Sequence, residues 1–384
     1  MDDMRAAFIF QLITLFRRQS RLLVILTFGL AVSEPVLAAN NRCNEPVFGV
    51  AGVQIDQRAE TASKARDMGI RNAAERAFAT VLDRLLATSD GRAQFMASHD
   101  LDDFSDFTHI VKENNLEKRY IAALDFCFDA ARLRQAMIAA GLQWSELQSP
   151  PILVVPVWKG PDGARAWYRD NKWLAGWWGA VASYKGLLSL RQLDRNLINE
   201  RQFRGEDLAD ANPAKLAAAA SLVKAEQVMV VMAALDYDGS KPVITITVRL
   251  FDKNGQLLTD ILYDDQMVLS NQDQDGLDAM RQKIIAKMDS SWHIANLIDD
   301  AAADNITVFM PVSSIKEWAK RLTALNAVAV IQNYDILSLD TTGGQVVLRL
   351  VGSREALVNA LAAHQLKLVD DNGRLLIKAK PKNS

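Results

Sequence analysis

Short apolar runs typical of β-strands recur along this chain, and sequence with helical periodicity lies between most of them. Val47–Ile55, Ile152–Val157 and Ile306–Val312 are three such runs, each with helical sequence further along. A sheet buries its apolar side chains only under a second layer, so strands interleaved with helices indicate layered folds. The 384 residues are enough for two or three domains of roughly 150 residues each. We therefore predict a mixed fold class, α/β and α+β.

The first predicted domain, residues 42–148, has a β-α-β-α order. Its opening strand precedes a long amphipathic helix from about Thr61 to Thr88, whose apolar residues recur at steps of three and four. Ser89-Asp90-Gly91 is expected to end this helix. Tyr120–Phe128 alternates like a strand, and Asp129 is expected to cap the last helix.

The second predicted domain, residues 150–300, begins after Ser149-Pro150-Pro151 and has a mixed α/β pattern. Asn254-Gly255 lies between two apolar runs and is a strong hairpin signal. The expected strands are 152–157, 227–235, 243–251 and 257–268, and the expected helices are 213–224 and 276–298.

The third predicted domain, residues 306–380, has the order β-α-β-β-α-β of a ferredoxin-like fold. Ser314 and Glu317 form a capping box that opens its first helix. A hairpin turning at Asn372-Gly373 closes the chain.

The amino-terminal segment resembles a secretory signal peptide. Leu22–Val32 is an apolar run of 11 residues that follows Arg17, Arg18 and Arg21. A membrane span needs about 20 apolar residues, so the run is too short to cross a bilayer. We predict a signal peptide over residues 1–38, cleaved near Ala38, and a periplasmic protein without a membrane span after cleavage. The alternative is an uncleaved leader that anchors a subunit of an inner-membrane complex.

Cys43 and Cys127 are the two cysteines of the chain. Disulfides persist in exported proteins, and a bridge between these residues would close a long loop, which stabilises a fold by about 4 kcal/mol. The alternative is a pair of free thiols, with Cys127 as a small core residue.

The passage Leu124–Asp129, Trp144 and the strand Ile152–Trp158 together resemble the domain-of-unknown-function family two-zero-six-six. Strong likeness covers about residues 45–160. The usual Arg-Pro before the middle strand is Pro150-Pro151 in this chain. The resemblance implies an uncharacterised exported protein of Gram-negative bacteria, and it carries over no catalytic residue.

Catalytic and metal-binding motifs are not evident in the sequence. The four histidines, His99, His109, His293 and His364, do not have the spacing of zinc ligands. The run from Asn271 to Gly276 resembles the start of a calcium loop, but Gln282 stands where the bidentate Glu is needed. Its acidic residues could instead cap the following helix. We predict no catalytic residue, no metal and no cofactor.

Six aromatic residues lie between positions 158 and 178. Clustered aromatic residues either pack together in a core or form a platform for sugars and peptides. The candidate binding surface comprises Trp167, Trp173, Trp177 and Trp178.

A net charge of −2 gives no electrostatic signature of nucleic-acid binding, so we predict no nucleic-acid partner. The leading hypothesis is a non-enzymatic envelope protein that binds a partner protein or a cell-wall component. The rival is an exported hydrolase whose site is assembled from residues distant in sequence.

Overall fold

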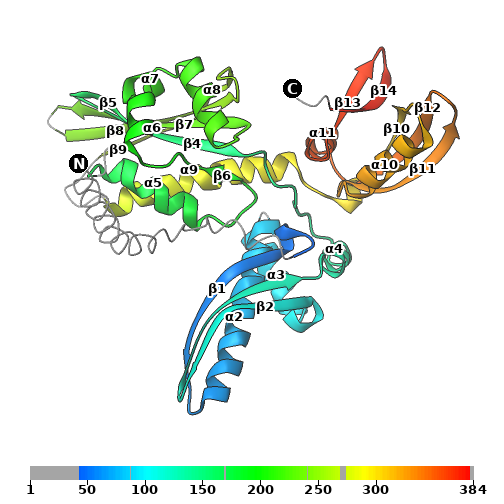
Figure 1. Ribbon diagram of the computed structural model, residues 1–384, viewed down its shortest axis with the longest axis horizontal. Helices are drawn as coiled ribbons and strands as arrows, with labels where there is room; N and C mark the ends of the chain where they lie inside the picture. The colour runs from blue at the N-terminus through cyan, green and yellow to red at the C-terminus, as the bar shows by residue number, and fades with distance from the viewer. Residues whose placement is uncertain (1–42, 87, 168–169, 240, 269–273, 381–384) are drawn as a thin grey trace, which may run out of the picture. The chain divides into compact units, whose positions relative to one another are not determined.

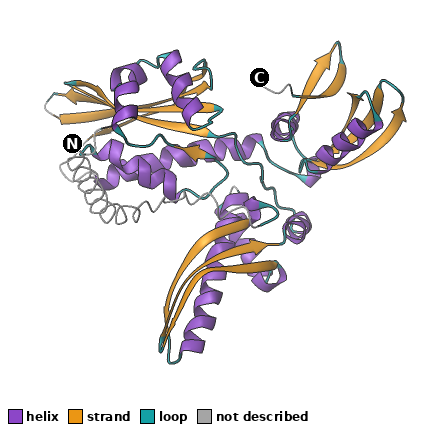
Figure 2. Cartoon of the chain, viewed as in Figure 1, coloured by secondary structure: helices purple, strands orange, loops and turns teal. Residues whose placement is uncertain are grey.

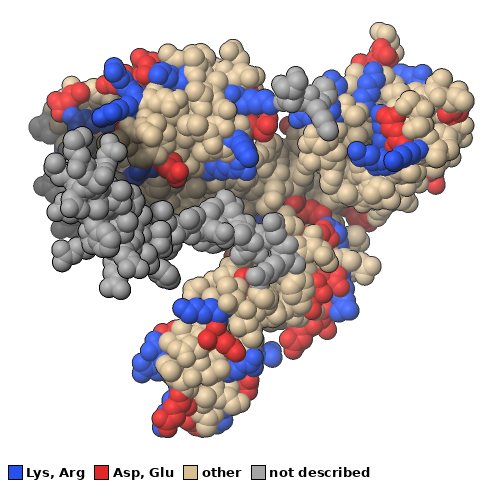
Figure 3. All heavy atoms as spheres, viewed as in Figure 1, with Lys and Arg blue, Asp and Glu red and all other residues tan. Residues whose placement is uncertain are grey.

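A computed structural model describes residues 43–86, 88–167, 170–239, 241–268 and 274–380. Three separate sheets, each with its own helices, make up this part of the chain, so the predicted mixed α/β and α+β class is confirmed (Figures 1 and 2). The predicted signal peptide lies outside the described residues. Basic and acidic side chains are interspersed over the face seen in Figure 3, in keeping with the small net charge.

The first sheet is antiparallel and has the order β1-β3-β2. Its elements, in chain order, are β1 (Gly49–Arg58), α2 (Ala62–Leu85), α3 (Ser89–Ser98), β2 (Ser105–Leu116), β3 (Arg119–Phe128) and α4 (Ala130–Ala139). One side of the long helix α2 is buried through residues such as Ala73, Ala77 and Val81.

The predicted β-α-β-α order of this region is incomplete, because α3 and β2 were not expected. Thr88 accepts a hydrogen bond from the Gly91 amide at 3.2 Å and caps α3, so the sequence after α2 starts a second helix. The side chains of β2 are exposed on both faces of the sheet except for that of His109, which is half-buried. A strand without a buried face has no apolar alternation to detect.

The second sheet has the order β5-β4-β7-β8-β9, and β6 pairs with β4. Its strands are β4 (Ile152–Gly160), β5 (Gly163–Arg165), β6 (Leu190–Arg191), β7 (Gln227–Asp238), β8 (Lys241–Asp252) and β9 (Leu257–Val268). Its helices are α5 (Lys172–Ser183), α6 (Leu197–Gln202), α7 (Gly205–Ala209), α8 (Pro213–Leu222) and α9 (Gln274–Ala295).

Helices cover both faces of this second sheet. Val154 packs on one face in a cluster that includes residues of α5 and α9, whereas Val155 packs on the other face in a cluster that includes residues of α7 and α8. Strands buried on both faces are continuously apolar, as β4 and β7 are.

The third sheet has the order β11-β12-β10-β14-β13. Its elements are β10 (Asp304–Pro311), α10 (Ile315–Asn326), β11 (Ile331–Leu339), β12 (Gly343–Leu350), α11 (Arg354–Ala363), β13 (Leu366–Asp371) and β14 (Arg374–Ala379). The predicted split β-α-β arrangement is confirmed, because β12 pairs antiparallel with both β10 and β11. The closing hairpin adds a difference: β14 lies between β10 and β13 and runs parallel to β10.

No described helix combines the length and the apolar character that a membrane crossing requires.

Candidate functional site

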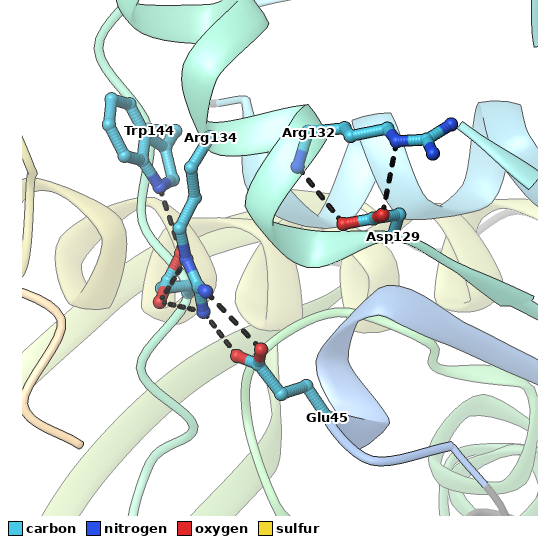
Figure 4. A network of polar contacts seen from close by, with 6 residues as sticks. Glu45, Asp129, Arg132, Arg134 and Trp144 are labelled. Carbon is cyan, nitrogen blue, oxygen red and sulfur yellow. Dashed lines mark hydrogen bonds and ion pairs between the residues drawn. The ribbon is translucent and has the colours of Figure 1, made fainter. Parts of the chain in front are cut away.

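A polar network beside a cavity is centred on Arg134, on helix α4 (Figure 4). Asp129 caps this helix by accepting a hydrogen bond from the Arg132 amide at 3.0 Å. Arg134 donates through Nε to both carboxylate oxygens of Glu146, at 3.1 and 2.9 Å. Its terminal nitrogens reach Glu45, with Nη1 at 3.2 Å from Oε1. One guanidinium therefore bridges two carboxylates.

Two aromatic residues complete the network. The indole Nε1 of Trp144 donates to Glu146 at 3.0 Å, and the Arg134 guanidinium lies 4.9 Å from the centre of the Phe48 ring. Burial alone would lower the pKa of Arg134, but its hydrogen bonds to Glu146 and then Glu45 raise the pKa above the ordinary arginine value. The guanidinium is thus a fixed positive charge.

A disulfide holds one side of this network in place. Cys43 and Cys127 are bonded in the structure, with Cα atoms 5.6 Å apart. Cys127 lies on β3, so the bridge attaches the segment before β1 to the sheet. Glu45 and Phe48 belong to this segment, and the Phe48 amide donates to the Glu45 carbonyl at 3.0 Å. The disulfide therefore positions two of the groups around Arg134.

The network lines a cavity of about 820 Å³. Backbone hydrogen bonds connect its walls, since Trp144 and Ile298 pair as a short antiparallel bridge and Asp299 donates to the Val351 carbonyl at 2.7 Å. The apolar lining residues include Phe48, Ile138, Ile298, Val328, Val330 and Ala360. The charged lining consists of Glu45, Glu146, Asp300 and Arg134, with His364 also present. The cavity lining therefore carries three carboxylates and one guanidinium, which is an excess of negative charge.

A second cleft, of about 690 Å³, lies between α5 and α9. Tyr184 donates its hydroxyl to Asp289 and accepts a hydrogen bond from the Leu188 amide at 3.0 Å. Burial and, after it, the Asp289 carboxylate raise the pKa of Tyr184, so its phenol stays protonated at neutral pH. His293 Nε2 lies 3.8 Å from Asp289 Oδ2, and its side chain is buried. The tyrosine acts here as a hydrogen-bond donor that fastens the 184–188 segment to α9.

The tryptophans proposed as a binding surface do not form one platform. Trp173 and Trp177 are fully buried, with their ring centres 5.5 Å apart in an edge-to-face arrangement. Half-buried Trp167 donates to the Phe203 carbonyl at 2.7 Å. Trp178 is half-buried, and the guanidinium carbon of Arg195 lies over it, 3.4 Å from the centre of the tryptophan ring. The structure corrects the surface hypothesis for Trp173 and Trp177, because a fully buried ring cannot receive a ligand, and core packing describes both.

The four histidines lie in different surroundings. His99 stacks on Phe95 at 4.3 Å, whereas His109 lies on β2 opposite Asp125. Among the described residues, no group of three or more histidine, cysteine or acidic side chains is arranged to hold a metal ion. Asn271 and Asp273 of the calcium-like sequence lie outside the described residues.

Sequence reasoning did not identify Glu45, Arg134 or Glu146 as site residues. Glu45 and Glu146 are 101 positions apart in the printed sequence, and neither belongs to a motif. Two weak signals were available. Glu45 lies close to Cys43, and Glu146 lies two positions after Trp144.

No family model matches this chain, and no curated protein matches it. The chain is similar to the lipoprotein GNA1162 from Neisseria meningitidis, with 17% identity, a TM-score of 0.23 and coverage of 36% of this chain and 96% of that one. It is also similar to the PelC dodecamer from Paraburkholderia phytofirmans, with 12% identity, a TM-score of 0.23 and coverage of 37% and 90%.

Proposed function

We propose that this chain is an exported protein of the cell envelope that binds a partner protein through the cavity beside Arg134. The observation that carries the proposal is the wall of that cavity, where Glu45 and Arg134 are partly exposed next to an apolar lining. A few oriented charges among apolar side chains are typical of binding sites.

The charges of the cavity favour recognition over a chemical step. Arg134, Glu45 and Glu146 are hydrogen-bonded to one another, and the raised pKa of Arg134 keeps its charge fixed. Three carboxylates against one guanidinium favour a partner segment that carries a basic side chain beside apolar ones.

Export rests on two features of the chain. The arginine-led apolar run before Ala38 resembles a signal peptide, and the Cys43–Cys127 bridge is of a kind that persists in oxidising compartments. Membership of the domain-of-unknown-function family two-zero-six-six remains a prediction, and it agrees with a periplasmic location.

A photoreactive amino acid at Ile138 tests the proposed cavity in intact cells. Ile138 lines the cavity and its side chain is 40% exposed, whereas Met96 on α3 is 42% exposed and is not among the cavity residues. We expect a discrete crosslinked protein from position 138 that is absent from position 96. The same products from both positions would contradict a cavity-specific partner.

Charge variants then connect the crosslink to the network. Glu45→Gln keeps the shape of the side chain but removes a charge from the cavity, and we expect a weaker crosslink from position 138. Glu60→Gln is the matched control, because Glu60 is an exposed carboxylate paired with Lys64 away from the cavity. Equal crosslinking in both variants would exclude a role for the Glu45 charge.

A further inference from the structure

The third sheet has helices on one face only, and on its other face several side chains are exposed, although Leu376 is buried and Phe309 and Lys378 are half-buried. Val308, Met310, Val346 and Leu348 belong to the core, together with residues of α10 and α11. The intervening residues of the same strands point to the opposite side, and Thr307, Gln345 and Arg349 there are exposed. The helices therefore leave one face of this sheet open, and its function is not accounted for by the Arg134 cavity.

Two lysines face each other on this open face. Lys367 of β13 is the direct partner of Lys378 of β14. The flanking Leu366, Leu368 and Ile377 pack into the core on the helix side, so both lysines lie on the open side. Like charges directly opposite each other in an antiparallel pair are destabilising. Neither lysine forms an ion pair with a carboxylate in the described part of the chain.

Two arginines extend the basic surface. Arg374 is four residues before Lys378 on β14, and its guanidinium lies 4.1 Å from the centre of the Phe309 ring. Stacking on an aromatic ring orients the planar guanidinium, whose paired N–H groups match a carboxylate. Arg349 lies on β12 between Asn305 and Asn333 of the neighbouring strands. The same register places two carboxylates on this face, Asp335 and Asp371, and the Asp340 carboxylate lies near enough to Arg374 to interact electrostatically with its guanidinium, so four cations face three anions.

The spacing of these cations indicates a polymer. The backbone positions of Arg374 and Lys378 are about 13 Å apart along the strand, a separation that suits an extended anion with more than one carboxylate better than one small anion. A chain with repeated carboxylates can contact both and reduce the repulsion between the lysines. Exposed hydroxyl and amide groups of Thr307, Gln345 and Asn305 also match sugar hydroxyls.

We propose that the open face of the third sheet, defined by Phe309, Arg349, Lys367, Arg374 and Lys378, binds a linear carboxylated polysaccharide. Sheets that bind single-stranded nucleic acid stack bases on exposed aromatic rings. Phe309 is already covered by Arg374, so this face favours a glycan over a nucleic acid. The Arg134 cavity has the opposite excess of charge, so the two proposals can fail independently.

Binding of a labelled alginate oligosaccharide to the purified protein tests this proposal, with dextran as the neutral control. We expect salt-sensitive binding to alginate and none to dextran. The double variant Arg374→Gln/Lys378→Gln should weaken alginate binding about tenfold, which corresponds to about 1.4 kcal/mol. The control is Lys316→Gln/Lys320→Gln, which removes two exposed charges from α10 on the covered side and should leave binding unchanged.

The single variant Lys378→Gln gives a second readout that a failure to fold cannot imitate. Removing one lysine of the opposed pair should raise the melting temperature of the free protein while weakening alginate binding. Equal binding to dextran, equal weakening by the α10 variant, or tighter binding of a single-stranded oligonucleotide than of alginate would each overturn the proposal.

Discussion

Buried arginines connect segments that are distant along this chain. Arg84 lies at the end of α2, and its guanidinium donates to the carbonyls of Val47, Gly49 and Lys185 at 2.5, 2.9 and 2.7 Å. Burial lowers the pKa of Arg84 to about 10. Since a buried cation is costly unless its donors are satisfied, these carbonyls account for its position.

The side chain of Arg281 explains why residue 176 of α5 is a glycine. Arg281 is fully buried, and a Cβ at position 176 would lie 2.6 Å from its Nε atom. We expect Gly176→Ala to destabilise the protein by about 1–3 kcal/mol, because the guanidinium would have to shift away from the Trp173 carbonyl and the Asp278 carboxylate that hold it. Gly179→Ala on the same helix has open space around its Cβ and should stabilise by about 0.5–1 kcal/mol. Urea unfolding of both variants measures the contrast, and equal effects would contradict it.

His293 makes stability depend on pH. Burial lowers its pKa below the ordinary 6.5, although the Asp289 carboxylate and the nearby Arg84 backbone oppose the shift. Below 6.5 the unfolded chain takes up a proton that the folded state resists, so stability should fall as the pH drops through this region. Melting temperatures between about pH 7.5 and 5 measure the slope. His293→Gln should flatten it, and an unchanged slope would assign the dependence to other groups.

At the scale of elements, side-chain caps determine where several helices begin. Thr61, Asp129 and Ser353 each accept a hydrogen bond from a backbone amide three residues later. Such caps satisfy amides that have no partner within the helix. The helix α3 begins in the same way at Thr88, directly after α2 ends. Helix starts are therefore encoded locally, but whether the preceding helix continues depends on packing.

The disulfide should matter more for the first sheet than for the others. It links residues 84 positions apart, so its removal in a Cys43→Ser/Cys127→Ser variant should cost up to about 4 kcal/mol. The segment with Glu45 and Phe48 should also lose order, because the bridge attaches it to β3. Denaturant unfolding gives the first quantity and amide exchange at Phe48 the second. Identical unfolding midpoints with and without reductant would show that the bridge is absent or has no effect.

At the scale of the whole molecule, the carboxylates and apolar lining of the Arg134 cavity come from segments far apart in sequence. Trp144 pairs with Ile298, and Ile298 pairs with Gly352, so three distant segments share backbone bridges. Neither the cavity nor its charge balance is visible in any single segment.

The compartment of the protein is also a property of the whole chain. If residues 1–38 are a signal peptide, the protein should appear in the osmotic-shock fraction with a mature amino terminus near Ala39. Mass spectrometry of the purified protein from its native host measures this terminus. A full-length chain in the cytosolic fraction would contradict export, and a full-length chain in the membrane fraction would support the anchored alternative.

The sequence by itself determined most of the strands and helices, because burial against one neighbouring layer leaves a period of two or 3.6 in the residues. It did not predict β2, whose exposed side chains have no such period. It also did not predict the position of β14 within its sheet, because strand order depends on contacts between distant segments. Only the tertiary structure decided that Trp173 and Trp177 are core residues while Glu45, Arg134 and Glu146 meet beside a cavity. The local sequence pattern indicates whether a residue is buried, but the tertiary fold determines which charged side chains come into contact.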